Sequence, residues 1–118
     1  MYGLSKNANE NLAFLVGKGI CQIAIGSFDV QFNWGNGGIS IESRFTYLPH
    51  GMNPIAWSSG NPEAAATTVR LLKAVITNIE CNQSLKLTFS NGDRLEIFED
   101  ERYESFSIWN GKNPIILV

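Results

Sequence analysis

Two carboxylates in similar local sequences, Glu42 and Glu104, are the first residues in this chain whose types could support catalysis. Each is followed by a serine. A pair of carboxylates flanking a glycosidic bond is the apparatus of most glycoside hydrolases, because one group supplies a proton while the other attacks or activates water. The sequence therefore allows a small-ligand-binding protein or a hydrolase that uses Glu42 and Glu104.

The position of Glu104 in its predicted strand is unusual for a carboxylate. The spacing over 103–109 places Glu104 on the same face as Phe106 and Ile108, and a carboxylate on an apolar face is costly unless it is paired. The simpler interpretation is a strand-end carboxylate that accepts a backbone N–H or pairs with an arginine such as Arg44. No further catalytic signature accompanies the two carboxylates in the sequence, so we expect a protein that is not an enzyme.

The most acidic part of the chain lies between Asp93 and Glu104. It holds six acidic residues and two arginines, a local charge of −4 in a chain of net charge −2. A concentration of one charge sign speeds the encounter with a partner of opposite sign and contributes to partner choice. A solvated loop without a partner is the alternative interpretation. We expect a basic protein to contact four of the acids: Glu99, Asp100, Glu101 and Glu104.

Histidine and cysteine offer little for metal binding or nucleophilic catalysis. His50 is the only histidine and lies in a loop rich in proline and glycine, and neither cysteine stands at ligand spacing from it. We therefore expect no metal and no cofactor. Cys21 and Cys81 lie in apolar runs, where a free cysteine behaves as a small core residue. We expect two buried thiols, with a Cys21–Cys81 disulfide between the two halves as the alternative.

Trp57 is the predicted apolar anchor of an interface. It lies between 48 and 60, a stretch with the proline, glycine and serine content of a loop. Tryptophan is enriched among the residues that contribute most to protein–protein binding. We therefore expect Trp57 to be exposed and to contact a partner together with the four acids.

Composition and length exclude several classes of protein. A net charge of −2 argues against nucleic-acid binding, which needs a concentrated cationic surface. The longest apolar runs are too short to cross a bilayer, and the N-terminal residues lack the pattern of a secretory signal. With 44% hydrophobic and 17% charged residues, the chain is typical of a globular domain. We expect one cytoplasmic domain over 1–118, without contact to nucleic acid or membrane.

Two similar stretches divide the chain into halves and predict its architecture. The stretch 30–37 (VQFNWGNG) is echoed by 85–92 (LKLTFSNG) at an offset of 55 residues. Both alternate apolar and polar residues, as half-buried strands do, and both end in Asn-Gly, which favours a type I′ hairpin turn because both residues tolerate positive φ. Alternation resumes after each turn. We therefore predict a duplicated antiparallel β-meander with units at about 19–47 and 74–109.

A single helix is predicted between the two units, at about 62–73. Asn61 is placed to cap it and Pro62 to occupy its first position. At α-helical spacing its apolar stripe consists of Ala65, Val69 and Leu72. The helix must pack on a sheet to persist, because a helix of this length is marginal alone in water.

The predicted fold is mainly β, in the α+β class, with about seven to eight strands and the helix between the halves. One strand is expected to run from 39 to about 47 without interruption. An open sheet leaves unpaired backbone groups at its edges. We therefore expect either a monomer or a homodimer that pairs through an edge strand.

The second meander and the segment after it carry a family resemblance. The pattern Leu85-x-Leu87-x-Phe89-x-Asn91-Gly92-x-x-Leu95-x-Ile97 is followed by Tyr103-Glu104-Ser105-Phe106-x-Ile108, and Ile39-Ser40-Ile41-Glu42-Ser43 also matches. These motifs resemble an uncharacterised family of small bacterial proteins with a closing Tyr-Glu-Ala/Ser-aromatic-x-Ile signature. Here the aromatic residue is Phe106, where tryptophan is common in the family.

The resemblance implies a role but no catalytic residues. Small proteins of this kind are often encoded in bacterial toxin–immunity loci, so it implies an immunity protein that neutralises a cognate toxin. Many such toxins are basic nucleases, which fits the local acidity of this chain. We therefore expect a non-enzymatic protein-binding module, with a basic protein toxin as its partner.

Overall fold

The computed structural model describes residues 12–99, 106–111 and 113–117. These residues form ten strands and two 3₁₀ helices. In chain order the elements are η1 (Ala13–Leu15), β1 (Gln22–Ile25), β2 (Val30–Trp34), β3 (Gly37–Ile41), β4 (Arg44–Leu48), β5 (Ile55–Ser58), η2 (Pro62–Leu71), β6 (Ile76–Cys81), β7 (Ser84–Phe89), β8 (Arg94–Phe98), β9 (Phe106–Asn110) and β10 (Asn113–Leu117). The predicted mainly β fold with a helix between the halves is confirmed.

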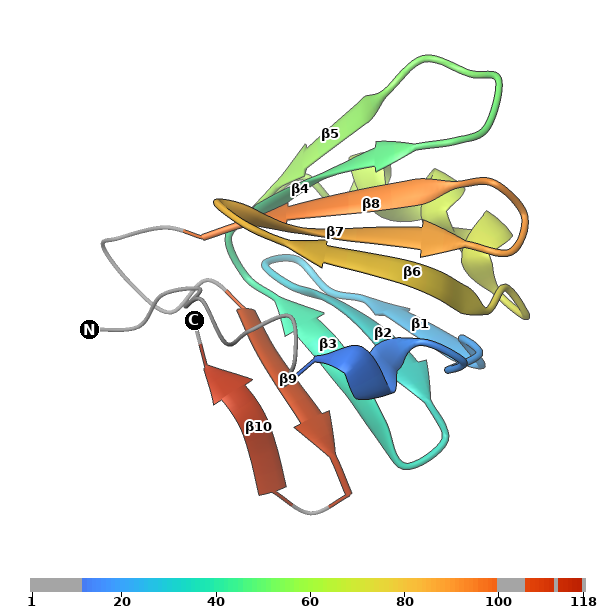
Figure 1. Cartoon of the computed structure of the whole chain (residues 1–118). Helices are drawn as coiled ribbons and strands as arrows, with labels where there is room; N and C mark the ends of the chain where they lie inside the picture. The colour runs from blue at the N-terminus through green and yellow to red at the C-terminus, as the bar shows by residue number, and fades with distance from the viewer. Residues whose placement is uncertain (1–11, 100–105, 112, 118) are drawn as a thin grey trace.

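The strands form two antiparallel five-stranded sheets (Figure 1). The first sheet has the order β1-β2-β3-β9-β10, and the second has the order β5-β4-β8-β7-β6. Each half of the chain contributes three strands to one sheet and then crosses to add two strands to the other. The strand order is therefore the same in both halves, in agreement with the predicted duplicated meander. Because neither sheet comes from one half alone, the two halves must fold together.

The described residues form more strands than the seven to eight predicted, for two reasons. The predicted strand over 39–47 is in fact two strands, because the chain bends at Glu42 and Ser43 and passes from the first sheet to the second. The alternation continues across this bend, so Ile41 and Phe45 are both buried. The predicted loop also contains a strand, β5, which pairs with β4 at the edge of the second sheet.

Alternate side chains of both sheets point inward and form one core. In the first sheet Phe32, Ile39 and Ile108 are register partners, and all three are buried. The second sheet contributes an equivalent row: Leu85, Ile97, Phe45 and Trp57. The rings of Phe32 and Phe45 meet edge to face with their centroids 5.9 Å apart. This favourable aromatic geometry links the two sheets.

The two hairpin turns differ from the predicted type I′. The loop of the first hairpin consists of Gly35 and Asn36, and only Gly35 has a positive φ, +64°. A glycine at the first central position is the pattern of a type II′ turn. In the second hairpin, Gly92 has a φ of +90° and donates its N–H to the carbonyl of Phe89. Positive φ falls on the glycines because they carry no Cβ.

The helix η2 is a 3₁₀ helix, and its period overturns the predicted apolar stripe. A 3₁₀ helix has three residues per turn, so side chains three positions apart share a face. The buried residues of η2 follow this spacing: Ala65, Thr68 and Leu71. Val69 and Leu72 of the predicted stripe are 51% and 43% exposed. Asn61 precedes the helix as predicted, but its side chain makes no capping hydrogen bond.

The helix η2 bridges the edge strands β1 and β5 of the two sheets. The N–H of Gly60, just before the helix, bonds to the carbonyl of Ser27, just after β1. At the other end, the N–H of Lys73 bonds to the carbonyl of Ile20, just before β1. The helix therefore runs antiparallel to β1. The first bond holds the β1–β2 turn against the segment that leads from β5 into the helix, and the second holds the end of the helix against the segment before β1.

Candidate functional site

Of the four acids predicted to contact a partner, Glu99 is the one that the structure describes. Asp100, Glu101 and Glu104 lie outside the described residues. Glu99 directly follows β8 and is partly buried. The acidic segment, by which we mean residues 99–104 of the sequence, therefore begins directly after β8.

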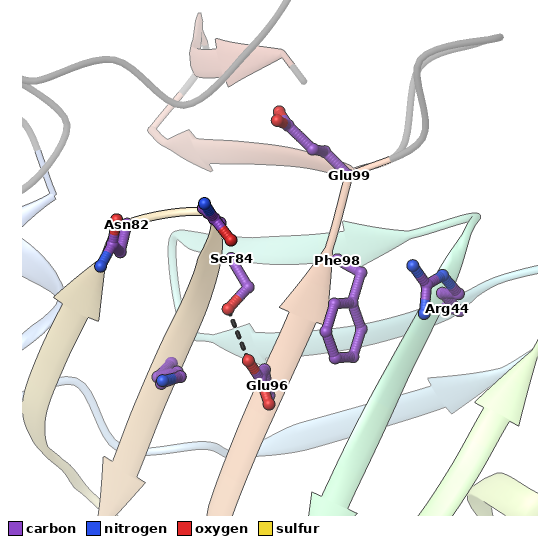
Figure 2. Close-up of a pocket in the computed structure, with 8 residues that line it drawn as sticks. Arg44, Asn82, Ser84, Glu96, Phe98 and Glu99 are labelled. Carbon is purple, nitrogen blue, oxygen red and sulfur yellow. Dashed lines mark hydrogen bonds between the residues drawn. The ribbon is translucent and has the colours of Figure 1, made fainter.

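A hollow of about 340 Å³ opens beside Glu99 on the outer face of the second sheet (Figure 2). Its walls come from β4, β7, β8 and the β6–β7 turn. The lining residues are Arg44, Asn82, Gln83, Ser84, Lys86, Glu96, Phe98 and Glu99. On the strands these positions alternate with residues that fill the core, so polar and charged side chains dominate the hollow.

Two side-chain contacts organise this first hollow. The Ser84 hydroxyl donates a hydrogen bond to a carboxylate oxygen of Glu96 over 2.6 Å (Figure 2). The guanidinium of Arg44 lies over the ring of Phe98, 4.4 Å from the ring centroid. The face of an aromatic ring attracts a cation, so this contact holds Arg44 against the sheet. The hollow therefore offers fixed hydrogen-bonding and charged groups, which suit the binding of a polar ligand.

Two further hollows continue from the first toward the β1–β2 turn. The second, of about 140 Å³, shares Arg44 and Phe98 with the first. The third, of about 380 Å³, is lined by Phe28, Asp29, Glu42 and Ser59. Ser58 of the second hollow precedes Ser59 of the third, and the N–H of Ser59 bonds to the carbonyl of Ser43. We call the three together the hollow band.

The hollow band carries more acidic than basic side chains. Its acids are Asp29, Glu42, Glu96 and Glu99. Its cations are Arg44 and Lys86. The band thus extends the acidity that the sequence shows after Asp93 onto the part of the surface near the β1–β2 turn. A surface of this charge attracts basic ligands and repels acidic ones.

The structure describes one of the two carboxylates of the hydrolase hypothesis. Glu42 lies in the third hollow, is exposed, and makes no hydrogen bond or ion pair with another described residue. Glu104 lies outside the described residues. A hydrolytic role that uses both stays a prediction.

Trp57 is buried, so its predicted exposure is wrong. Its side chain is 1% exposed and stacks on Phe45, with the ring centroids 5.1 Å apart. The loop-like sequence around Trp57 forms β5, whose register places Trp57 opposite the inward-facing Phe45. Trp57 is therefore a core residue and no anchor for a partner.

Comparison with known protein families, with curated proteins and with solved structures finds no match to the chain. The resemblance to a family of small bacterial proteins therefore stays a prediction. A fold by itself does not determine a function. The function is inferred from the geometry and charge of the site.

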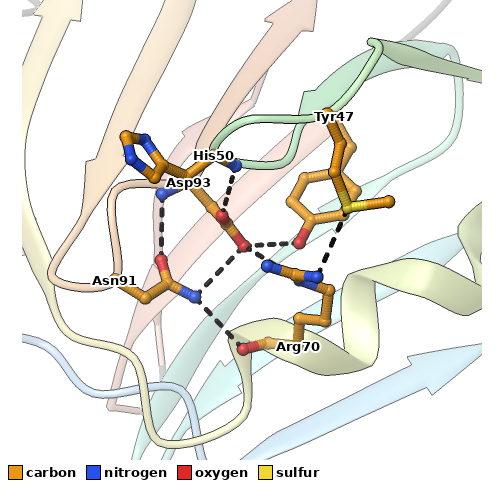
Figure 3. Close-up of polar contacts among 6 residues, drawn as sticks. Tyr47, His50, Arg70, Asn91 and Asp93 are labelled. Atoms are coloured by element: carbon orange, nitrogen blue, oxygen red, sulfur yellow. Dashed lines mark hydrogen bonds and ion pairs between the residues drawn. The ribbon is translucent and has the colours of Figure 1, made fainter.

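A second group of polar side chains surrounds Asp93, which is fully buried (Figure 3). One carboxylate oxygen accepts hydrogen bonds from the Tyr47 hydroxyl at 2.5 Å and from the Asn91 amide at 3.1 Å. The other oxygen accepts the backbone N–H of His50 at 2.8 Å. Nε of Arg70 lies 3.8 Å from Asp93. The carboxylate thus joins β4, the loop after β4, the β7–β8 turn and η2.

These contacts determine the protonation states of Asp93 and Tyr47. Burial by itself would raise the pKa of Asp93, but the hydrogen bonds from Tyr47 and from the His50 N–H, together with the charge of Arg70, outweigh burial and lower this pKa. Burial, followed by the hydrogen bond and the charge of Asp93, raises the pKa of Tyr47. All polar partners of Asp93 support its ionised form, so we interpret the group as structural. Sequence analysis did not identify the Asp93 group. A signal for it was present, because the asparagine in Asn-Gly-Asp at 91–93 is a residue type whose side chain often hydrogen-bonds to the backbone of a turn.

The two cysteines lie in different environments, and they form no disulfide. Cys81 is buried as predicted, and burial raises the pKa of its thiol. Cys21 is exposed, so its predicted burial is wrong. It lies just before β1, and its sulfur accepts the N–H of Gly35 over 3.1 Å.

Neither a metal site nor a membrane span is found in the described part of the chain. Within residues 12–99, 106–111 and 113–117, no three histidine, cysteine, aspartate or glutamate side chains lie in a group that could hold a metal ion. Over the same ranges, no helix is long and apolar enough to cross a membrane. His50 lies in the loop after β4 and contributes its backbone N–H, as described above, to the Asp93 group.

Proposed function

We propose that this protein is a non-enzymatic protein-binding module that acts as a cytoplasmic immunity protein and neutralises a basic bacterial toxin. The observation that carries this proposal is the hollow band, which combines three concave regions, an excess of carboxylates and the exposed ring of Phe28. Such a surface steers a partner of opposite charge toward it and disfavours partners of like charge.

The scaffold holds the hollow band in a fixed shape. The Ser43 hydroxyl donates a hydrogen bond to the carbonyl of Phe98 over 2.8 Å and so ties the bend after β3 to the end of β8. On the other side, the N–H of Ser59 is bonded to the same bend. A surface that is ordered before binding loses little conformational freedom when a partner arrives. This favours stable association with one partner.

The acidic segment adds to the band. It begins at Glu99, which lines the first hollow, so the acids that follow it in sequence start from the edge of the site. A nuclease must present cations to bind nucleic-acid phosphates. An acidic protein can cover those cations through the same charges. The resemblance to proteins of toxin–immunity loci supports the same role.

The test uses the product of the reading frame adjacent to the gene of this protein. We expect the two purified proteins to bind in isothermal titration calorimetry, with an affinity that falls as salt rises. The triple variant E99K/D100K/E101K should weaken binding by at least about tenfold, because it reverses charge at the edge of the first hollow. In cells, the same variant should lose protection against the toxin.

The control is Glu63→Lys, which reverses one charge, where the triple variant reverses three, on η2 at an exposed position that lines none of the hollows. It should bind within about twofold of the parent protein, as expected for a charge outside the contact. If the adjacent product does not bind, or if the triple variant and Glu63→Lys behave alike, the proposed function is wrong.

A further inference from the structure

The third hollow contains the most exposed large apolar side chain among the described residues. Phe28 is 69% exposed and lines this hollow with two carboxylates, those of Asp29 and Glu42. The remaining lining residue is Ser59, so no cation of the described chain contributes to the wall. An exposed aromatic ring costs free energy in water, and aromatic side chains, phenylalanine among them, are enriched at protein–protein interfaces.

The backbone holds Phe28 in this exposed position. The N–H of Gly26 bonds to the carbonyl of Asp29 over 2.8 Å and closes the turn between β1 and β2. The Ser59 hydroxyl donates to the carbonyl of Phe28 itself, at 3.4 Å. With the bond from Gly60 to Ser27 described above, two successive residues, Ser59 and Gly60, hold the turn against the start of η2. The ring is therefore presented by a rigid turn.

The two carboxylates keep capacity to accept hydrogen bonds. The Gln31 amide donates to one oxygen of Asp29 at 3.3 Å, and the other oxygen has no hydrogen-bond donor among the described residues. Glu42 makes no hydrogen bond or ion pair with another described residue, as noted above. A ligand in this hollow would thus meet one aromatic face and several carboxylate oxygens that accept hydrogen bonds.

We propose that the third hollow takes the side chain of an arginine from the protein partner, an inference that rests on the proposed function. A guanidinium is planar, stacks on aromatic rings and pairs with carboxylates through two parallel hydrogen bonds. The chain shows half of this arrangement within itself, where Arg44 lies over the ring of Phe98. Phe28 thus provides the apolar anchor of the interface, the role that sequence analysis assigned to Trp57.

Other ligands fit this hollow less well. The two carboxylates repel a phosphate, a carboxylate or an anionic lipid headgroup. A lysine ammonium is a strongly hydrated point charge and has no planar group that could stack on the ring. A hard metal ion would bind the carboxylates, but the exposed ring of Phe28 supplies no oxygen ligand. An arginine uses both the ring and the carboxylates.

The test needs no knowledge of the partner. The probes are N-acetylarginine amide, its uncharged isostere N-acetylcitrulline amide, and N-acetyllysine amide, each titrated into the whole ¹⁵N-labelled protein. We expect the arginine probe to shift the amide signals of 26–29, Glu42 and Ser59 saturably at millimolar concentration, as for a single surface ion pair with a cation–π contact. The citrulline probe should cause no saturable shift, and the lysine probe should bind several-fold more weakly.

Two variants and one control make the result specific. Phe28→Ala should abolish saturable binding of the arginine probe, and D29N/E42Q should weaken it at least about fivefold. Val16→Ala removes another exposed apolar side chain, 47% exposed and outside the hollow band, and should leave binding unchanged. Equal shifts with arginine and citrulline, or binding that survives Phe28→Ala in a folded variant, would overturn the inference.

The outcomes separate this inference from the proposed function. Binding of the arginine probe without binding of the adjacent gene product would retain the arginine site and reject the toxin as its source. Binding of the adjacent product with no effect of Phe28→Ala would retain the proposed function and reject the arginine site.

Discussion

The hydroxyl of Tyr47 donates a hydrogen bond to the carboxylate of Asp93 over 2.5 Å, inside a site where both side chains are fully buried. The two residues are 46 positions apart and belong to different halves of the chain. Their contact joins β4 to the β7–β8 turn. A buried carboxylate of this kind stabilises the fold only while all of its partners are present.

Removal of the Tyr47 hydroxyl should destabilise the protein without enlarging a cavity. We expect Tyr47→Phe to lower the free energy of unfolding by about 1.5–3 kcal/mol, the usual range for a hydrogen bond to a charged group. Urea unfolding followed by tryptophan fluorescence measures this change. A double-mutant cycle with Asp93→Asn should give a coupling energy of at least about 0.5 kcal/mol. Additive effects of the two substitutions would contradict a direct bond.

Acidic pH should lower the free energy of unfolding, because Asp93 then becomes protonated. Its pKa is lowered below the ordinary value of 3.8 in the folded state, so the unfolded chain takes up the proton more readily. The stabilisation by Asp93 is therefore complete at neutral pH, declines below about pH 5 and is lost as the pH falls through the folded pKa.

The comparison that checks this is the free energy of unfolding of the parent protein and of Asp93→Asn between neutral pH and pH 3. The parent protein should be the more stable of the two at pH 7, and the difference should shrink as the pH falls. Glu63→Asn, at an exposed position on η2, should show no comparable dependence on pH. A difference that stays constant over this range would show that ionised Asp93 is not the cause.

The 3₁₀ period of η2 predicts that alanine substitutions at two adjacent leucines have very different effects on the free energy of unfolding. Leu71 is fully buried, and Leu72 is 43% exposed. Leu71→Ala should cost about 2–5 kcal/mol of unfolding free energy because it leaves a cavity. Leu72→Ala should change the unfolding free energy by no more than about 0.5 kcal/mol, as surface substitutions usually do. Thermal unfolding of both variants checks this, and the reverse order would support the α-helical stripe.

The two thiols should react at very different rates. Cys21 is exposed and Cys81 is buried, with its pKa raised by that burial. The reactive form of cysteine is a thiolate that solvent can reach. We therefore expect Cys21 to react promptly with a maleimide in the native protein and Cys81 to react only after unfolding. Peptide mapping identifies the modified residue. Prompt labelling of Cys81 in the native state would contradict the observed burial.

Much of the core was predictable because burial within a strand follows a local period of two. The alternation in the two similar stretches correctly predicts that Phe32 and Leu87 are buried. The alternation in the predicted strand over 39–47 likewise predicts the burial of Phe45, although the chain changes sheets before this residue. Pro62 likewise marks the start of η2 correctly. These features depend on neighbours in the sequence, which the chain itself specifies.

The features that the sequence analysis assigned wrongly or did not identify depend on contacts between distant segments. Trp57 is buried because β5 adds to β4, and Phe28 is exposed because a turn is held against the start of η2; neither contact has a local signal. The period of η2 follows from packing against β1 and β5, since its own composition is compatible with an α-helix. The Asp93 group needs residues from four elements at once. By itself the sequence determined the alternating strands, the repeat and the position of the helix. Only the tertiary structure decided which of the other side chains are exposed, because exposure is set by how the elements pack.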